Sequence, residues 1–256
     1  MLFDSHAHLD NPRFNEDRDE LIKSFKENGV DLVLNPGADI ETSKRSIELA
    51  QKYDFIYAAV GVHPHDVGEL KDDAIDELRK LALSSDKVKA IGEIGLDYYY
   101  DNSPRDVQRE WFKKQILLAN ELKLPIIIHD RDAHQDTFDI LKEYKSDEIG
   151  CVLHCYSGNV ELAKEYVKMG YYLSIPGTVT FKNNVKTVEV VRQIPLEYLL
   201  IETDSPYMAP VPNRGKRNDP TMVQFVADKI AQEKGVSYET VCKATKENAK
   251  RLFNIK

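Results

Sequence analysis

The sequence has no apolar run long enough to cross a membrane. None of its uninterrupted hydrophobic stretches approaches the ~20 residues that a membrane-spanning helix needs. The first residues, MLFDSHAHLD, lack a basic segment followed by an apolar one, so we do not expect a secretory signal peptide. These absences predict a cytoplasmic protein that does not associate with membranes.

Cysteine is also scarce. The 256 residues include only Cys151, Cys155 and Cys242, and an odd count does not fit the disulfide framework of a secreted protein. Cys151 and Cys155 are four positions apart, but in a strand-like sequence rather than a zinc knuckle. Cys155 follows His154 in the same predicted strand, so the two side chains should point to opposite sides. We therefore expect reduced thiols.

Basic residues are in the minority, with 35 Lys and Arg against 43 Asp and Glu, a formal net charge of -8. This balance argues against a protein that coats nucleic acid with a broad basic face. It is compatible with an enzyme that binds the end of a nucleic-acid strand, because bound divalent metal ions would offset part of the acidic charge.

Two catalytic sequence signatures are missing as well. No glycine-rich phosphate loop is present, which disfavours nucleoside triphosphate chemistry. Ser5, Ser157 and Ser205 are near histidines, but no G-x-S-x-G turn supports a serine nucleophile.

Short apolar runs alternate with longer amphipathic stretches along the chain. The runs are rich in β-branched residues and do not alternate in polarity, which is typical of strands buried on both faces. They begin near residues 2, 30, 55, 88, 125, 150, 170 and 197, with helix-like segments at 17–28, 103–122 and 159–170 and one or two closing helices within 219–256. We predict an α/β fold, a single-domain (β/α)8 TIM barrel over residues 1–256, with an open doubly wound sheet as the alternative.

Histidines and carboxylates gather at the ends of these runs. His6 and His8 are two apart in the first predicted strand, so their imidazoles should face the same side. In a (β/α)8 barrel the C-terminal ends of all strands open onto one face, where the active site lies. His134 stands apart, because it falls where the helix after the fifth strand begins.

A lone histidine is more often a hydrogen-bonded core residue than a ligand, and a lone buried carboxylate can pair with an arginine. Together, however, these polar and acidic groups would lie close to one another at the C-terminal end of the barrel, where burial is costly unless a cation is bound. We therefore predict that the metal ligands are His6, His8, Glu93, His129, His154 and Asp204.

Four histidines and two carboxylates exceed one tetrahedral site, which indicates two divalent metal cations per chain. Mixed imidazole and carboxylate ligation suits Zn, Mn or a similar ion, and Mg stays open. Such ions acidify water and stabilise both the attacking and the leaving oxygen of a phosphodiester. Asp204 would accept the proton of the attacking water, and Glu93 could bridge the two ions.

A second set of residues is suited to the substrate. His63 and His65 flank Pro64 after the third strand, and Arg131 lies two residues past His129. The loop NRGKRNDP (213–220) carries Arg214, Lys216 and Arg217, which suit a phosphate but could equally be solvated or pair with Asp132 or Asp219.

Tyr98, Tyr99 and Tyr100 follow the fourth strand. Their rings could stack on a base or form a packing cluster, and the sequence does not decide between the two.

The chain resembles the TatD family of metal-dependent deoxyribonucleases, which lies within the amidohydrolase superfamily of (β/α)8 barrels. The resemblance extends over essentially the whole chain. Its motifs are DSHAHLD at 4–10, GVHPH at 61–65, IGEIGLD at 91–97, IIHDRDA at 127–133, LHCYSG at 153–158 and LLIETDSPY at 199–207.

The resemblance implies two ions, one held by His6, His8, Glu93 and Asp204 and the other by Glu93, His129 and His154. It further implies that His63 and His65 contact the scissile or a neighbouring phosphate, which makes His63 a candidate catalytic residue beside Asp204 and Glu93. Arg131 and Arg217 stay candidates for substrate binding because of their charge and position. The implied activity is 3'→5' exonucleolytic hydrolysis of DNA. The sequence leaves the oligomeric state open, and a monomer is compatible with it.

Two other functions stay open at this point. Superfamily relatives cleave amides and other esters, so the ester of a charged tRNA is a conceivable substrate. A non-catalytic metal-binding scaffold is disfavoured, because the sequence carries a candidate base and a structural metal site would be closed by protein ligands.

Overall fold

The computed structural model describes all residues from 1 to 256. Eight strands form one sheet in which they follow chain order. The strands are β1 (Leu2–Asp4), β2 (Val30–Pro36), β3 (Ile56–Val60), β4 (Val88–Asp97), β5 (Ile126–Arg131), β6 (Cys151–Leu153), β7 (Tyr172–Ile175) and β8 (Leu199–Ile201). Each strand lies at a predicted apolar run, which confirms the predicted (β/α)8 fold class.

Helices occupy the amphipathic stretches between the strands. They are α1 (Arg18–Ser24), α2 (Ile40–Lys52), α3 (Ala74–Leu83), α4 (Arg105–Leu122), α5 (His134–Tyr144), α6 (Val160–Lys168), α7 (Val185–Gln193), α8 (Val223–Lys234) and α9 (Tyr238–Leu252). The two closing helices are confirmed as α8 and α9. The helix expected over 17–28 is shorter, because the chain leaves the helix after Ser24 and turns through Gly29 at φ +81°.

The chain forms two compact units, residues 1–35 with 155–256 and residues 36–154. In the first unit β1 pairs with β2 in parallel and β7 pairs with β8 in parallel. A single bridge between Ala7 and Ser205 joins the segments that follow β1 and β8. Helix α9 is fastened to β8 by Asn248, whose side-chain amide donates to the carbonyl of Leu199 over 2.9 Å.

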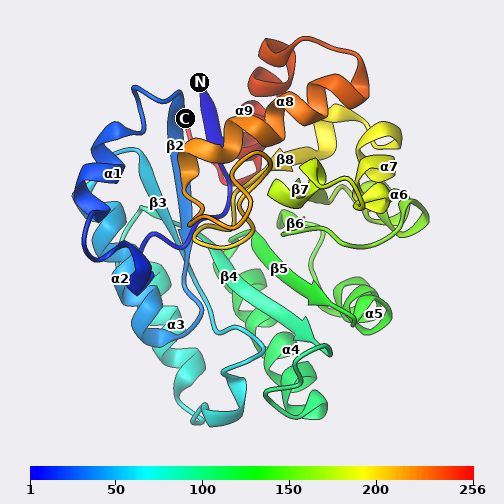
Figure 1. The fold of residues 1–256 in the computed structure, drawn as a ribbon. Helices are drawn as coiled ribbons and strands as arrows, with labels where there is room; N and C mark the ends of the chain where they lie inside the picture. The colour runs from blue at the N-terminus through cyan, green and yellow to red at the C-terminus, as the bar shows by residue number, and fades with distance from the viewer. The chain divides into compact units, whose positions relative to one another are not determined.

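The second unit contains β3 to β6, again as parallel pairs. Figure 1 shows β4 and β5 side by side, and their register matches Gly95 with His129 and Asp97 with Arg131. These strands therefore bring the chain around Glu93 and the chain around His129 to the same level of the sheet. The expectation of a single domain over residues 1–256 stays a prediction.

Two glutamines on one face of α4 hold the ends of β3 and β4. Gln115 accepts from the backbone N–H of Val62 over 2.8 Å and donates to its carbonyl over 3.0 Å. Gln108 accepts from the N–H of Asp97 over 2.9 Å and donates to its carbonyl over 3.1 Å. Both glutamines are fully buried. Because each amide bonds both the backbone N–H and the carbonyl of one residue, α4 fixes the chain beside His63 and at Asp97.

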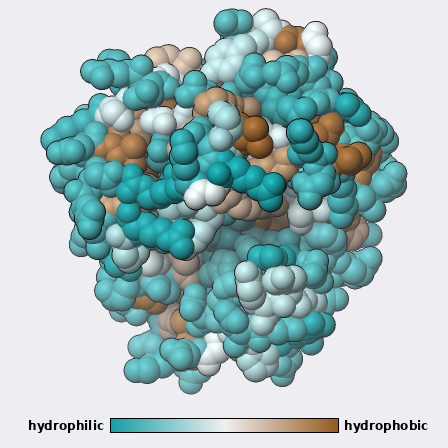
Figure 2. Space-filling view, viewed as in Figure 1, coloured by the Kyte–Doolittle hydropathy of each residue, from teal (hydrophilic) through white to brown (hydrophobic).

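The surface in view is largely hydrophilic, with hydrophobic residues in scattered patches (Figure 2). No helix combines the length and the apolar composition that crossing a bilayer requires.

We expect Gln115→Leu to lower the free energy of unfolding by about 2 kcal/mol or more. The substitution leaves the buried N–H and C=O of Val62 without their partner, and each unsatisfied group costs roughly 1–3 kcal/mol. Urea denaturation followed by circular dichroism measures the change. Gln135→Leu is the matched control, since Gln135 is exposed and bonds only Asp139 on its own helix. Equal losses in both variants would contradict the role of Gln115.

Candidate metal centre

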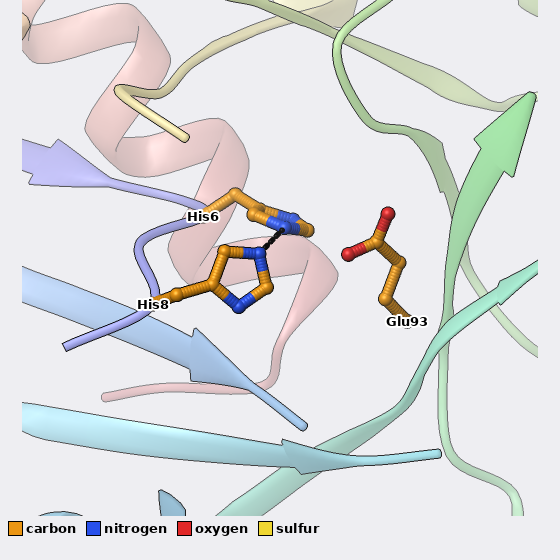
Figure 3. Close-up of side chains that lie close together, drawn as sticks. All are labelled: His6, His8 and Glu93. Atoms are coloured by element: carbon orange, nitrogen blue, oxygen red, sulfur yellow. Dashed lines mark hydrogen bonds between the residues drawn. The ribbon is translucent and has the colours of Figure 1, made fainter. Parts of the chain in front are cut away.

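His6 and His8 form the first group of candidate ligands. They lie just beyond β1, which ends at Asp4, rather than inside it as the sequence suggested. The chain still runs in a strand-like way there, because His8 donates its backbone N–H to Ser205 and Ala7 donates its own to Leu34. The imidazoles point the same way, with their Nε2 atoms 3.2 Å apart (Figure 3, which also draws Glu93).

Asp204 joins this group from the segment after β8. Its Oδ1 lies 3.5 Å from His8 Nε2 and 3.8 Å from His6 Nε2. Asp204 adopts a left-handed backbone with φ +52°, and its N–H bonds the carbonyl of His6 over 2.9 Å. Ligands of one tetrahedral ion with bonds of about 2.0 Å stand about 3.3 Å apart, so the three donor atoms fit a single metal ion.

A buried carboxylate, Asp4, links the two chain segments that carry this group. Its oxygens accept from the Thr203 N–H over 2.9 Å and from the Thr203 hydroxyl over 2.5 Å. The backbone N–H of His6 also points to it over 3.3 Å. Burial raises the pKa of Asp4 well above its ordinary value. Asp4 thereby ties the chain before His6 to the chain before Asp204.

Glu93 is the centre of the second group, which lies within residues 36–154. Its Oε1 is 2.8 Å from His129 Nδ1, 3.3 Å from His154 Nε2 and 3.5 Å from His63 Nε2. Glu93 lies in the middle of β4 and His129 in β5, whereas His154 follows the end of β6. All of these side chains except that of His129 are almost fully buried.

Asp97, at the end of β4, is the residue that orders this second group. One of its oxygens, Oδ2, lies 2.8 Å from His65 Nε2 and 3.1 Å from His129 Nε2. The other, Oδ1, accepts the N–H groups of Tyr99 and Tyr100. Burial opposes charge on Asp97, but the hydrogen bonds from His129, from the Tyr100 backbone and from His65 outweigh it and hold its pKa below the ordinary value.

The contacts with Asp97 and Glu93 also orient the ring of His129. Nε2 lies 3.1 Å from Asp97 Oδ2 and Nδ1 lies 2.8 Å from Glu93 Oε1. A metal ion bound at Nδ1 would leave the hydrogen on Nε2, where it faces Asp97. Burial would lower the pKa of His129, but the hydrogen bonds to Asp97 and Glu93 raise it. A carboxylate behind a ligating histidine is the usual arrangement in metal sites.

His63 is arranged as a donor rather than as a ligand. Its Nδ1 accepts the backbone N–H of His65 over 3.2 Å, so a neutral imidazole carries its proton on Nε2. Burial, reinforced by the neighbouring His129, lowers the pKa of His63 to about 4, which keeps the ring neutral at pH 7. The Nε2–H therefore suits a substrate oxygen more than a metal ion.

The arginines expected to bind substrate differ in their surroundings. Arg131 places its guanidinium over the rings of Tyr99 and Tyr100. Arg217 instead makes a two-point ion pair with Asp17, at 2.8 and 2.5 Å, a partner that the sequence analysis did not foresee. A role for Arg217 in substrate binding stays a prediction. Its ion pair joins the loop after β8 to Asp17 at the start of α1.

Other residues of the sequence analysis lie outside these groups. His134 begins α5 and bonds Asp130, apart from the ligands as expected. Cys155 lies past the end of β6 in a left-handed turn at φ +46°, so the strand alternation assumed for it and His154 does not apply. None of the three cysteines forms a disulfide.

The donor set of both groups is chemically suited to divalent metal ions. Imidazole nitrogens and carboxylate oxygens lie within ligand distance of one another in each group, and His63, Glu93 and His129 place their ligand atoms within 4.8 Å. Asp4 and Asp97 are not among the site residues that the sequence predicts. The signal was available, since a carboxylate in an apolar strand needs a partner, the same argument that selected Glu93.

Comparison with known proteins agrees with this chemistry. A family model described as TatD related DNase matches residues 3–254. An uncharacterized metal-dependent hydrolase of Bacillus subtilis is 48% identical over 255 residues, covering 100% of both chains. A protein of Cronobacter sakazakii named 3'-5' ssDNA/RNA exonuclease TatD is 34% identical, over 98% of this chain and 97% of its own. The crystal structure of a TatD homologue from Escherichia coli superposes with a TM-score of 0.93 at 31% identity, covering 100% of this chain and 98% of that one.

We expect Asp97→Asn to weaken metal binding roughly 10–100-fold, the usual effect of losing a carboxylate behind a ligating histidine. The amide cannot accept from two imidazoles and two backbone N–H groups as the carboxylate does. Competition with a chromogenic chelator measures the affinity. Asp101→Asn is the control, since Asp101 is exposed and pairs with Arg105. Unchanged affinity in Asp97→Asn would disprove the positioning role.

Proposed function

Since this chain belongs to the TatD-related DNase family and is a metal-dependent hydrolase, we propose that it hydrolyses phosphodiester bonds of DNA as a 3'→5' exonuclease. The observation that carries the proposal is the convergence of three imidazole nitrogens on Glu93 Oε1, at 2.8 to 3.5 Å. The similar protein of Cronobacter sakazakii, named as a 3'-5' exonuclease, supports the polarity. A cytoplasmic location is part of the proposal.

Two divalent cations per chain are part of the same proposal. His6, His8, Glu93 and Asp204 would hold one, and Glu93, His129 and His154 the other, with Glu93 shared. The ions supply Lewis acidity, which acidifies water and offsets the charge of the phosphate. Zn, Mn and Mg are the ions to test.

The side chains of this protein have separate tasks in the proposed reaction. Asp204 accepts the proton of the attacking water, because its carboxylate reaches the imidazoles of the first group yet keeps some exposure. His63 donates its Nε2–H to an oxygen of the scissile phosphate. His65 lies beside it, with Asp97 fixing its ring, and contacts the same or the neighbouring phosphate.

Glu93→Gln should reduce hydrolysis of single-stranded DNA by more than roughly a hundredfold, because even an indirect partner of a metal ligand is worth 10–100-fold. The assay measures nucleotide release with Mn, Mg or Zn added. Glu148→Gln is the matched control, since Glu148 is exposed and only 3.5 Å from Lys123 in a surface pair. Full activity of Glu93→Gln would contradict the proposed site.

Removal of metal by a chelator should abolish activity, and added Mn or Zn should restore it, with two ions per chain by elemental analysis. Strands labelled at the 3' or the 5' end then determine the polarity, since 3'→5' digestion releases the 3' label first. A panel of DNA, RNA and simple esters tests the substrate class. An enzyme fully loaded with metal that cleaves an ester, such as an aminoacyl-tRNA, but no DNA would disprove the deoxyribonuclease and favour the other hydrolase.

A further inference from the structure

Two tyrosine rings are exposed to solvent directly after β4, the strand that carries Glu93. Tyr99 is 58% exposed and Tyr100 is 54% exposed, and the rings meet edge to face with centroids 4.9 Å apart. Tyr98 behaves differently, since its hydroxyl bonds Asp136 over 2.6 Å and Arg105 covers its ring. Of the three tyrosines, one is used for packing and two are presented to solvent.

The backbone beneath the two exposed rings is fixed. The N–H groups of Tyr99 and Tyr100 both donate to Asp97 Oδ1, over 3.0 and 2.9 Å. The N–H of Tyr98 donates to the carbonyl of Arg131 on the neighbouring strand over 2.9 Å. Because this backbone is already ordered, less conformational entropy is lost when a ligand binds to the rings.

Arg131 adds a positive charge to the two rings. Its guanidinium carbon lies 4.0 Å from the Tyr99 ring centroid and 4.7 Å from that of Tyr100. No carboxylate lies within ion-pair distance of it, in contrast to Arg105, which pairs with Asp101 over 2.6 Å. The guanidinium of Arg131 therefore keeps its hydrogen-bond donors for an incoming anion.

These residues adjoin the histidine cluster inside the same unit. The Tyr100 ring meets the His65 ring edge to face at 5.3 Å, and His65 meets His63 at 4.3 Å. Asp97 contacts His65 through Oδ2 and accepts the Tyr99 N–H through Oδ1. One carboxylate therefore fixes the position of the tyrosines relative to the His65 ring. A group bound at the rings is thus placed next to the site proposed for the scissile phosphate.

We propose that Tyr99, Tyr100 and Arg131 form a nucleobase-stacking platform that binds the nucleotide next to the scissile phosphate of single-stranded DNA. Because the two rings are perpendicular, the base stacks on the face of one of them, Tyr100, and the guanidinium of Arg131 contacts the adjoining phosphate. Aromatic faces accept any base, so the platform binds without sequence preference. Arg131 supplies a local positive charge there, although the chain as a whole is acidic. The inference rests on the proposed function and specifies how its substrate is held.

The test is a cycle of two changes, Tyr100→Leu in the protein and removal of the bases in the substrate. The substrates are a single-stranded DNA and the same strand with stable abasic sugars at the four nucleotides of each end. Binding is measured by fluorescence anisotropy with the metal chelated, and hydrolysis with Mn added. We expect Tyr100→Leu to weaken binding of the normal strand roughly 5- to 100-fold and the abasic strand far less. The loss should appear mainly in KM.

Tyr57→Leu is the matched control, because Tyr57 also lies under a cation, with Lys87 4.8 Å above its ring, but at the start of β3. It should bind both strands as the wild type does. Equal losses on the two strands, or no loss on either, would overturn the platform even if the wild type digests DNA. A wild type that cleaves no DNA would overturn the deoxyribonuclease. In that case the binding measurements still test the platform. The platform is supported only if Tyr100→Leu weakens binding of the normal strand more than binding of the abasic strand.

Discussion

The two oxygens of the Asp97 carboxylate contact four nitrogen groups, and this one carboxylate positions the candidate site of the second unit. Oδ2 faces the imidazoles of His65 and His129, and Oδ1 receives two consecutive backbone N–H groups. Gln108 in turn bonds both backbone groups of Asp97 from α4. A buried anion with this many donors stays charged, and it fixes each donor in orientation. The candidate ligand His129 and the exposed tyrosines therefore have a common anchor.

The first unit uses the same principle with a different residue. Asp4 is as buried as Asp97, but its partners are a hydroxyl and backbone N–H groups rather than imidazoles, and burial raises its pKa. Asp97 is thus stabilised as an anion beside histidines, whereas burial raises the pKa of Asp4, which links the chain at the end of β1 to the segment after β8. Asp4 contacts the backbone of His6, two residues further along the chain, and Asp97 contacts the ring of His129 on the neighbouring strand.

The proposed division of labour follows from proton positions. His129 faces a carboxylate with each ring nitrogen, and a cation bound at Nδ1 would leave its hydrogen on Nε2, facing Asp97. His63 keeps its hydrogen on Nε2, which lies 3.5 Å from Glu93 Oε1, because its Nδ1 accepts the His65 N–H. Two histidines that look alike in sequence are thereby suited to opposite tasks, one to hold a cation and one to donate to an anion.

The sequence alone determined the fold class and the positions of the strands, because buried parallel strands have an apolar composition that can be read locally, and it identified the family through six motifs in order. It also selected both groups of candidate ligands, since histidines and carboxylates at strand ends need a common partner. It could not determine that Arg217 pairs with Asp17, that Arg131 has no carboxylate partner, or which tyrosines are exposed. Those properties depend on which side chains meet across distant segments, and the proton positions of the histidines depend on the same contacts. Only the tertiary structure brings those partners together, because contacts between residues far apart in the chain leave no local pattern.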